Sequence, residues 1–512
     1  MKLKTHHNVL ILAGLIVVLL VSRFLLLFEG VIPFGFDHGK DSLAILEMVS
    51  TLSPSLIGPW TSIPGLYFGA GWYYLLAPFY LLGGYHPLSG VVVMVLLLAL
   101  QVGLAYKYFG FWPAALMVAA PFWFIISISA WNPFPMTLIT LLLLIVLKWI
   151  FKEKELSLRN GFLLGFIAAT GFHFSSAYAI FYPVLILVLL LYKRVRLSLW
   201  SVLVTGLGYL LPFTPQILFE FRNQFVQSNA VFGYFRTGET QTRTLARSLE
   251  TVNTTYSELR LAFMPELRAA PTWINKVLQT GLLVSLGFIF VLKRLWRKPL
   301  VKQYLLYFVS FVGIPLVGYQ FLHFNVWYVY GMMPVIAVLV GHLISQQPKW
   351  LQAIWGLALI GTAISLVTYF HFTNKAELVG ARAFLPVKVQ ALDLIREESG
   401  GEPFASYHYV PDIYDFSYQY LYFYQAFQGE QLPVEFAYEP NVQPYITQKE
   451  NLLSLFPSNQ QSPKKIFFIV ESAEESEFLT DWWNRQHYGE IIKTIPLSKE
   501  VTIFVATPKQ GE

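Results

Sequence analysis

The sequence predicts a polytopic α-helical membrane protein that ends in a soluble, extracytoplasmic α/β domain. Hydrophobic residues make up 55% of the 512 residues and charged residues only 13%, about half of the roughly 25% usual in globular proteins. Residues 1–371 carry 25 Lys or Arg and 11 Asp or Glu, whereas residues 372–512 carry 11 and 19. This composition excludes a cytosolic enzyme, a disordered chain and a fibrous repeat. We expect a membrane module over 1–371 and the soluble domain over 372–512.

Apolar stretches of about 17–23 residues predict spanning helices, because backbone polar groups cannot face lipid unpaired. The first stretch lacks a small-residue cleavage site and predicts a retained anchor. We expect about eleven spans, near residues 8–28, 88–107, 110–129, 134–150, 160–174, 176–192, 197–219, 275–292, 303–321, 326–345 and 351–371.

Lys and Arg in short loops set the orientation, since such loops stay in the cytoplasm. Lys2 and Lys4 predict a cytoplasmic N-terminus, and the basic turns near 148–159, 193–196 and 293–298 agree with it. They agree only if Leu66–Gly84 does not cross. That segment is aromatic and broken by Gly and Pro78, as in an interfacial helix. Residues 29–87 and about 220–273 are then external loops, and the C-terminal domain is extracytoplasmic.

The C-terminal domain carries signals of both helix and strand. Residues 386–398 have a helical period, and residues 465–471 and 500–506 are rich in β-branched and aromatic residues, which is typical of strands. Residues 414–427 are very aromatic and fit either a helix or a packed strand. The seven tyrosines between 407 and 424 fit core packing better than a sugar- or peptide-binding surface.

Acidic residues are scarce in the membrane module, and four of the eleven lie in the first external loop. In FGFDHGKDSLAILEMV, Gly35 and Gly39 loosen the backbone, and Asp41 begins an amphipathic segment as an N-cap or first-turn acid. Asp37 has no such structural role. Held at the membrane surface beside His38 and Lys40, it can serve as a general base, although a plain solvated acid remains the alternative.

This loop resembles that of the GT-C glycosyltransferases, in particular the protein O-mannosyltransferase and aminoarabinose-transferase branch. The resembling elements are FDHGKDSLAILEMV and GPWTSIPGLYFGAGWYYLLAPFY, followed by the run of spans, the long loop after the seventh span and the external tail. The resemblance implies that Asp37 is the catalytic base. It would take a proton from an acceptor as that acceptor attacks C1 of a sugar carried on a polyprenyl or dolichyl phosphate, with inversion.

Two positions depart from the family pattern. Asn132 stands where a second acid is common, and Thr61 and Ser62 stand where a phosphate-binding Lys is common. Other cations would then have to meet the phosphate, and guanidinium suits it. The second external loop has six arginines and no lysine before Trp273: Arg222, Arg236, Arg243, Arg247, Arg260 and Arg268. We favour Arg222, oriented by Glu220; pairing with nearby glutamates is the alternative.

Three further outer-side residues are candidates. His173, with Ser175 and Ser176, is expected between two spans, where it could touch the donor or simply bond between helices. Tyr328 lies in FLHFNVWYVYG and is a candidate for donor-phosphate binding or for an interfacial aromatic belt. Asp41, His38 and Lys40 are expected to support Asp37 or contact the acceptor. Asp37 and Asp41 with a distant His could hold Mg²⁺ or Mn²⁺, but no metal-ligand spacing occurs on a predicted helix.

The sequence therefore predicts a multi-pass cell-membrane glycosyltransferase with a lipid-phosphate sugar donor and a protein, lipid or glycan acceptor. Membrane lipids surround it, and no nucleic-acid partner is expected. No Walker loop or dinucleotide fingerprint occurs, which argues against a nucleotide-sugar enzyme or an ATP-driven pump. The alternative is a transporter or lipid-carrier flippase without glycosyl transfer. Transporters usually carry ionisable residues deep within their spans, whereas these spans are nearly free of charge apart from Arg23.

Overall fold

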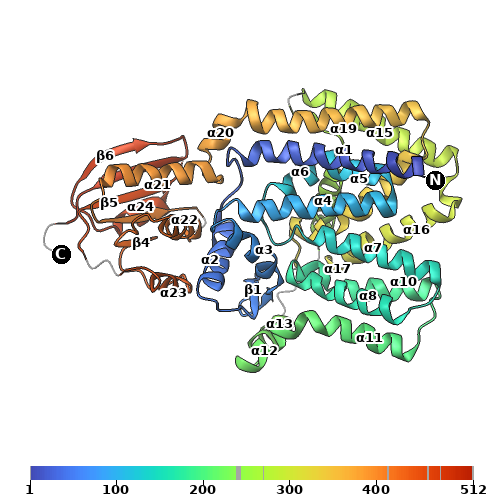
Figure 1. The fold of residues 1–512 in the computed structure, drawn as a ribbon, viewed down its shortest axis with the longest axis horizontal. Coiled ribbons are helices and arrows are strands. Elements are labelled where there is room, and N and C mark those ends of the chain that lie inside the picture. Colours follow the sequence, from blue (N-terminus) through green and yellow to red (C-terminus); the bar gives the residue numbers. More distant parts are fainter. Residues whose placement is uncertain are drawn as a thin grey trace. The chain divides into compact units, whose positions relative to one another are not determined.

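A computed structural model describes residues 2–237, 244–268, 270–411, 414–457, 461–472 and 474–509 (Figure 1). The chain divides into two compact units. The first consists of Met1–Arg23, Ser55–Tyr74 and Met94–Thr368, and the second of Phe24–Pro54, Leu75–Val93 and Tyr369–Glu512. The second unit therefore combines the C-terminal region with two segments from the predicted first external loop and its flanks. Each unit is described by itself below.

The first unit is a bundle of apolar helices. Helices α1 (Lys2–Leu27) and α4 (Ser89–Phe109) lie partly in this unit and partly in the second. The unit also contains α5 (Phe111–Ala119), α6 (Pro121–Ser127), α7 (Met136–Glu153), α8 (Leu158–Thr170), α9 (Ser176–Ala179), α10 (Tyr182–Tyr192), α11 (Leu199–Leu210), α12 (Thr214–Arg222), α13 (Val226–Thr237), α14 (Leu245–Leu261), α15 (Thr272–Leu292), α16 (Pro299–Phe308), α17 (Ile314–Gly318), α18 (Met333–Ser345) and α19 (Lys349–Thr368).

Every predicted span coincides with helix. In the described residues, seven helical stretches are long and apolar enough to cross a membrane: Asn8–Leu27, Ser89–Phe109, Leu199–Arg222, Thr272–Leu292, Pro299–Gly318, Val326–Ser345 and Lys349–Thr373. The other four predicted spans are shorter, interrupted or end in charged residues. For example, residues 110–129 form α5 and α6, which Pro121 separates because proline cannot continue a helical hydrogen-bond ladder. The count of eleven spans stays a prediction.

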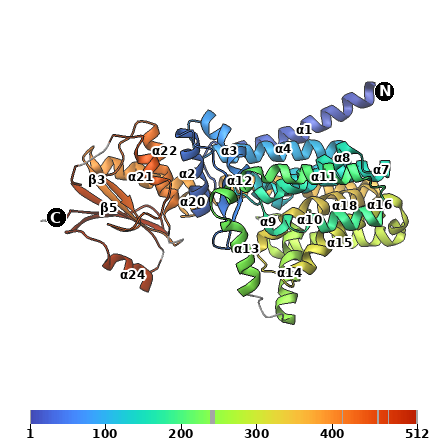
Figure 2. The same ribbon diagram turned by 90° about the horizontal axis from the view of Figure 1, so that it is seen from below.

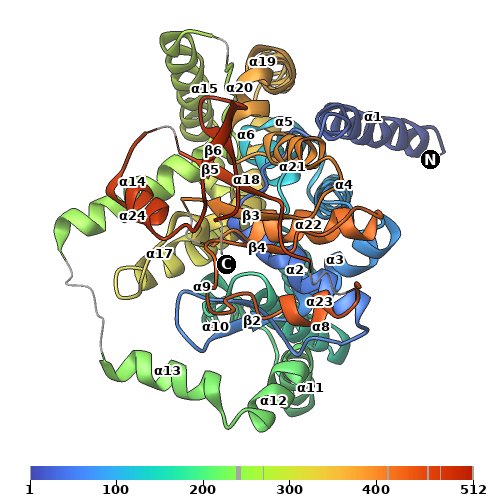
Figure 3. The same cartoon turned by 90° about the vertical axis from the view of Figure 1, so that its left-hand side faces the viewer.

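Helices α8 and α11 pack closely through glycine (Figure 3). A Cβ on Gly165 of α8 would lie 2.8 Å from the Tyr209 nitrogen of α11, and one on Gly208 would lie 3.1 Å from the carbonyl carbon of Phe162. Small residues permit such backbone approach in membrane helices, where dispersion contacts rather than water exclusion drive association.

The segment Leu66–Gly84 is not a long helix. Its first residues form β2 (Tyr67–Gly69), which pairs antiparallel with β1 (Ile57–Trp60), and α3 then covers Gly71–Leu82. Twelve helical residues rise about 18 Å, well short of a hydrocarbon core of about 30 Å. The prediction that this segment does not cross agrees with that length.

The C-terminal region of the second unit is a five-stranded mixed sheet with helices on both faces. The strand order is β4-β3-β5-β7-β6, with β3 parallel to both β4 and β5 and the remaining pairs antiparallel. The strands are β3 (Phe404–Tyr409), β4 (Glu435–Ala437), β5 (Lys465–Glu471), β6 (Ile491–Pro496) and β7 (Val501–Ala506). The helices are α20 (Lys375–Gly380), α21 (Leu385–Ser399), α22 (Phe416–Phe427), α23 (Lys449–Leu453) and α24 (Glu477–Asn484).

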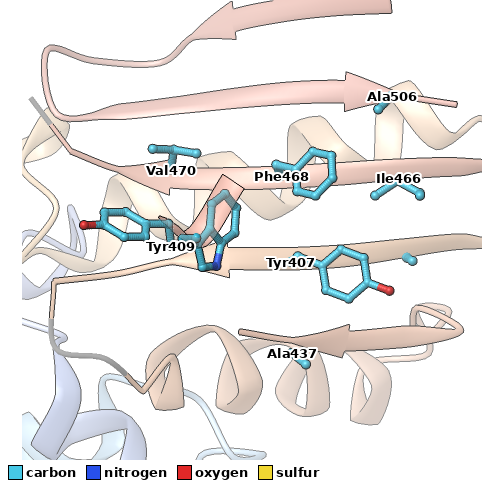
Figure 4. Close-up of a cluster of buried hydrophobic side chains, with 9 residues drawn as sticks. Tyr407, Tyr409, Ala437, Ile466, Phe468, Val470 and Ala506 are labelled. Atoms are coloured by element: carbon cyan, nitrogen blue, oxygen red, sulfur yellow. The ribbon is translucent and has the colours of Figure 1, made fainter. Parts of the chain in front are cut away.

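The α/β prediction for this region is confirmed. The predicted helix is α21, the two predicted strands are β5 and β7, and the ambiguous aromatic segment is the helix α22. Helices α21 and α22 cover one face of the sheet and α24 the other (Figures 2 and 3). Tyr407, Tyr409 and Phe468 pack with Trp482 of α24 in one buried core (Figure 4). Five of the seven tyrosines expected to pack, Tyr407, Tyr409, Tyr418, Tyr420 and Tyr422, are buried.

Candidate functional site

The first helix in the predicted first external loop is α2 (Phe36–Ser50), which belongs to the second unit. Gly35 is its N-cap, and Asp37 is the acidic residue of its first turn. The expected assignment is thus reversed: Asp41 neither caps the helix nor lies in its first turn. It sits one turn further along and is buried. The helix begins earlier than expected, with Gly35 as its N-cap and Phe36 as its first residue. Asp37 therefore lies in the first turn, where the positive end of the helix dipole stabilises its carboxylate.

Asp37 is partly exposed and forms an ion pair with Lys40 of the same helix. Its side chain is 39% exposed, whereas that of Lys40 is 9% exposed. The Lys40 ammonium donates to Asp37 Oδ1 at 2.6 Å, the i,i+3 spacing that brings two side chains to one helix face. The same ammonium lies 5.2 Å from the centre of the Phe36 ring. Lys40 therefore orients a carboxylate that remains accessible from outside the helix.

His38 is a neutral hydrogen-bond acceptor in this arrangement. Its Nδ1 accepts from the Gly35 nitrogen at 3.3 Å, which closes the N-terminus of α2. Burial lowers the pKa of His38 to about 4, with Asp37 acting in the opposite direction and Lys40 in the same one. His38 is thus uncharged at neutral pH. The expected supporting roles of His38, Lys40 and Asp41 stay predictions.

The sequence interpretation missed the role of Gly39. We expected it to loosen the backbone, but it lies inside α2, where a Cβ would come within 2.5 Å of the carbonyl carbon of Phe416 in α22. A glycine inside a helical pattern signals either weakness or close approach. Local sequence cannot decide between them, because the approaching chain lies almost 380 residues away.

The other predicted site residues lie in the first unit. Arg222 is the last residue of α12 and is exposed. Glu220 accepts from the backbone nitrogens of Gln227 and Ser228 at 2.9 Å each and from the Ser228 hydroxyl at 2.6 Å. It thereby caps the N-terminus of α13. Its expected role, orienting Arg222, stays a prediction.

Three other arginines of the predicted second external loop make polar contacts with residues of the first unit. Arg268 pairs with Glu266 at 3.1 Å, Arg260 donates to Gln279, and Arg247 donates to the Leu322 carbonyl. Arg243 lies outside the described residues. Pairing with a glutamate, the alternative explanation for these arginines, thus applies to Arg268.

His173 is buried and packs against the glycines that flank β2. Its Nδ1 accepts from the Gly71 nitrogen at 3.1 Å, and a Cβ on Gly71 would lie 2.8 Å from its ring. This contact favours the interpretation of His173 as a structural residue. Asn132, at the position where the family often has an acid, donates to the Phe174 carbonyl at 2.9 Å.

Tyr328 is half-buried in an aromatic cluster at the start of the segment that leads into α18. Its ring lies 5.9 Å from that of Tyr319 and 6.0 Å from that of Trp327. Among the described residues, no group of three or more His, Cys, Asp or Glu side chains is arranged to hold a metal ion. Binding of Mg²⁺ or Mn²⁺ stays a prediction, and no such cluster of side chains in the described residues corresponds to it.

Comparison with known proteins identifies the fold. No family model matches the chain, and no curated protein matches its sequence. The chain is similar to the crystal structure of ArnT from Cupriavidus metallidurans bound to undecaprenyl phosphate, with a TM-score of 0.58, 12% identity and 98% of each chain covered. The apo state of the same protein gives a TM-score of 0.58 and 13% identity over 98% of each chain. The chain therefore has the fold of these ArnT structures. Seven of its described helical stretches are long and apolar enough to cross a membrane, and its C-terminal region is α/β, so the predicted fold class is confirmed.

Proposed function

We propose that this protein is an integral membrane glycosyltransferase that transfers a sugar from a polyprenyl-phosphate donor to an acceptor on the extracytoplasmic face. The observation that carries the proposal is the likeness to ArnT over 98% of both chains, joined to an accessible carboxylate at the first turn of α2. The ArnT crystal contains undecaprenyl phosphate, which supports a polyprenyl-phosphate partner. The acceptor class is open among protein, lipid and glycan.

Asp37 is the proposed general base. As the acceptor oxygen or nitrogen forms its bond to C1 of the sugar, its proton passes to the Asp37 carboxylate. The bond between C1 and the phosphate oxygen breaks, its electron pair stays with the lipid phosphate, and C1 inverts. The Lys40 ammonium at 2.6 Å holds the carboxylate in one orientation. Proton transfer to a base positioned in this way contributes about 10²- to 10⁴-fold to a rate.

The departing phosphate gains negative charge, so cationic or hydrogen-bonding groups should stabilise it. Arg222 is the proposed ligand, because its guanidinium is exposed at the end of α12 and can meet phosphate through two parallel hydrogen bonds. Tyr328 is the proposed second contact. The packing of His173 against Gly71 makes it a weaker candidate.

Transfer of a radiolabelled sugar from a polyprenyl-phosphate donor tests the proposal. Asp37→Asn should reduce transfer at least about 100-fold. Glu47→Gln is a matched control, because it also removes a carboxylate from α2. The Glu47 carboxylate accepts an exposed hydrogen bond from Asn451, so this variant should keep nearly wild-type transfer. Equal transfer by wild type and Asp37→Asn would contradict the role of Asp37. Movement of the lipid across vesicles without any transfer would favour the transporter alternative.

A further inference from the structure

Helix α2 rests directly on α22, and the contact is made by backbone. At Gly39, two residues after Asp37, a Cβ would lie 2.5 Å from both the Phe416 carbonyl carbon and the Ser417 Cα. Real Cβ atoms do not come that close to backbone atoms. Any side chain at position 39 would therefore force α2 and α22 apart.

Aromatic rings that precede Asp37 in the chain add to this contact. The Phe36 ring packs edge-on against Phe416, with centroids 5.1 Å apart. It also lies 6.3 Å from the ring of Tyr414. Phe34, which precedes the helix, lies 5.7 Å from Tyr420 of α22. Such offset pairs add about 0.5–1.5 kcal/mol each to the apolar area that they bury.

Tyr80 and Tyr420 extend the junction to α3. The Tyr420 hydroxyl donates to the carbonyl of Tyr85, just after α3. The Tyr80 ring of α3 packs edge-on against Tyr420, and its hydroxyl shares a 2.8 Å hydrogen bond with Ser42 of α2. Three helices from distant parts of the sequence thus meet around Tyr420, which is fully buried.

Helix α22 is itself fixed to the sheet. Buried Asp415 at its N-terminus pairs with His408 of β3 and accepts from Tyr445 at 2.5 Å and Gln419 at 2.9 Å. Burial raises the pKa of Asp415, but these partners hold it below its usual value. On the next turn, Tyr418 donates to Glu471 of β5 at 2.7 Å. The sheet therefore provides a rigid base for α22, and through α22 for α2.

We propose that α22 sets the position of the Asp37 carboxylate, with Gly39, Phe416 and Tyr420 as positioning residues. The C-terminal region is then part of the catalytic apparatus and not only a cover or an acceptor-binding domain. This inference rests on the proposed function. Its physical basis is that a reacting group misplaced by about 1 Å can lose about 100-fold in rate, and a methyl group at position 39 demands a displacement of that order.

Kinetics of the full-length protein in nanodiscs test the inference. Gly39→Ala should lower kcat for sugar transfer about 10- to 100-fold and leave KM for the donor within about twofold, because Asp37 acts on the acceptor proton. Tyr420→Phe keeps the ring and removes one hydrogen bond, so it should lower kcat by less, about 3- to 10-fold. Gly103→Ala is the control, since a Cβ at Gly103 of α4 meets nothing within 4 Å.

Hydrogen–deuterium exchange of α2 provides a second measurement that does not depend on activity. In Gly39→Ala and Tyr420→Phe, residues 36–42 should exchange faster than in wild type, while the sheet strands exchange at the wild-type rate. If Gly39→Ala does not fold, the kcat and the hydrogen–deuterium exchange of Tyr420→Phe test the inference without it. Wild-type kcat and wild-type exchange in Tyr420→Phe would overturn the inference. Asp37→Asn with wild-type transfer would instead overturn the proposed function, and the positioning of Asp37 with it.

Discussion

Arg23 is fully buried near the end of α1, and its guanidinium reaches three acceptors. It donates to Ser127 Oγ at 3.1 Å, Ser22 Oγ at 2.7 Å and the Val118 carbonyl at 2.9 Å, and it stacks 4.6 Å from the Phe124 ring. Val118 lies in the last turn of α5, where helix carbonyls have no partner of their own. Arg23 thus supports the break between α5 and α6.

Replacing Arg23 by Met should destabilise the protein by roughly 1–3 kcal/mol, because it leaves buried polar groups without a partner. Arg23→Lys should recover only part of this loss, since an ammonium cannot reproduce the planar guanidinium fork. Thermal unfolding of the purified variants in detergent measures the effect. A wild-type midpoint in Arg23→Met would contradict the assigned role.

His38 makes stability depend on pH. Its folded-state pKa of about 4 lies below the unfolded value of 6.5, so between these values the unfolded chain binds a proton that the folded chain does not. Stability should therefore rise with pH across this window and fall as the pH drops from 7 to 5. His38→Gln should show a smaller loss between pH 7 and pH 5 in thermal unfolding. An identical loss of stability in wild type and variant would show that His38 does not cause the pH dependence.

At the level of single residues, the sequence predicted which segment carries the candidate base, because acids are scarce in an apolar chain. It did not predict how Asp37 and Asp41 divide their roles, since the helix start depends on the conformation of Gly35 and Phe36. It also could not reveal that Glu220 caps α13. The hydrogen-bond partners of Glu220 are Gln227 and Ser228. They follow a turn that no sequence pattern in this segment predicts.

At the level of elements, the packing of α8 on α11 depends on Gly165. A methyl group there would lie 2.8 Å from the Tyr209 nitrogen of the neighbouring helix, so Gly165→Ala should separate the helices and lower the thermal midpoint. Gly206→Ala is the matched control, because a Cβ at Gly206 of α11 meets nothing within 4 Å. Alanine also favours helix over glycine by about 1 kcal/mol. A midpoint for Gly165→Ala as high as that of Gly206→Ala would contradict this packing argument.

Element prediction succeeded where one local pattern dominates. The apolar spans and the strands β5 and β7 are continuous runs of one type of residue. It was silent on β3 and β4. Strand β3 (FASYHY) is buried throughout, but its His, Ser and Tyr residues interrupt the apolar run that marks a buried strand. Strand β4 has only three residues. The β1–β2 hairpin was also missed, since its strands have four and three residues.

For the whole molecule, the unequal distribution of charge predicts a membrane module over 1–371 and a soluble domain over 372–512, and this division stays a prediction. The fold contains two compact units. Their boundaries differ from the predicted division at residue 371, because α2 and part of α3 join the C-terminal sheet in the second unit. Contacts between segments more than 300 residues apart determine such a division. Neither composition nor periodicity reports contacts at that separation.

The proposed function requires the chain to break a sugar–phosphate bond on a lipid donor. The decisive experiment uses purified protein in nanodiscs, given a polyprenyl-phosphate donor with a labelled sugar and a mixture of candidate acceptors. We predict labelled acceptor and free polyprenyl phosphate in equal amounts from wild type, and at most about 1% of either from Asp37→Asn. An intact donor after prolonged incubation with wild type, whatever the acceptor offered, would contradict the account.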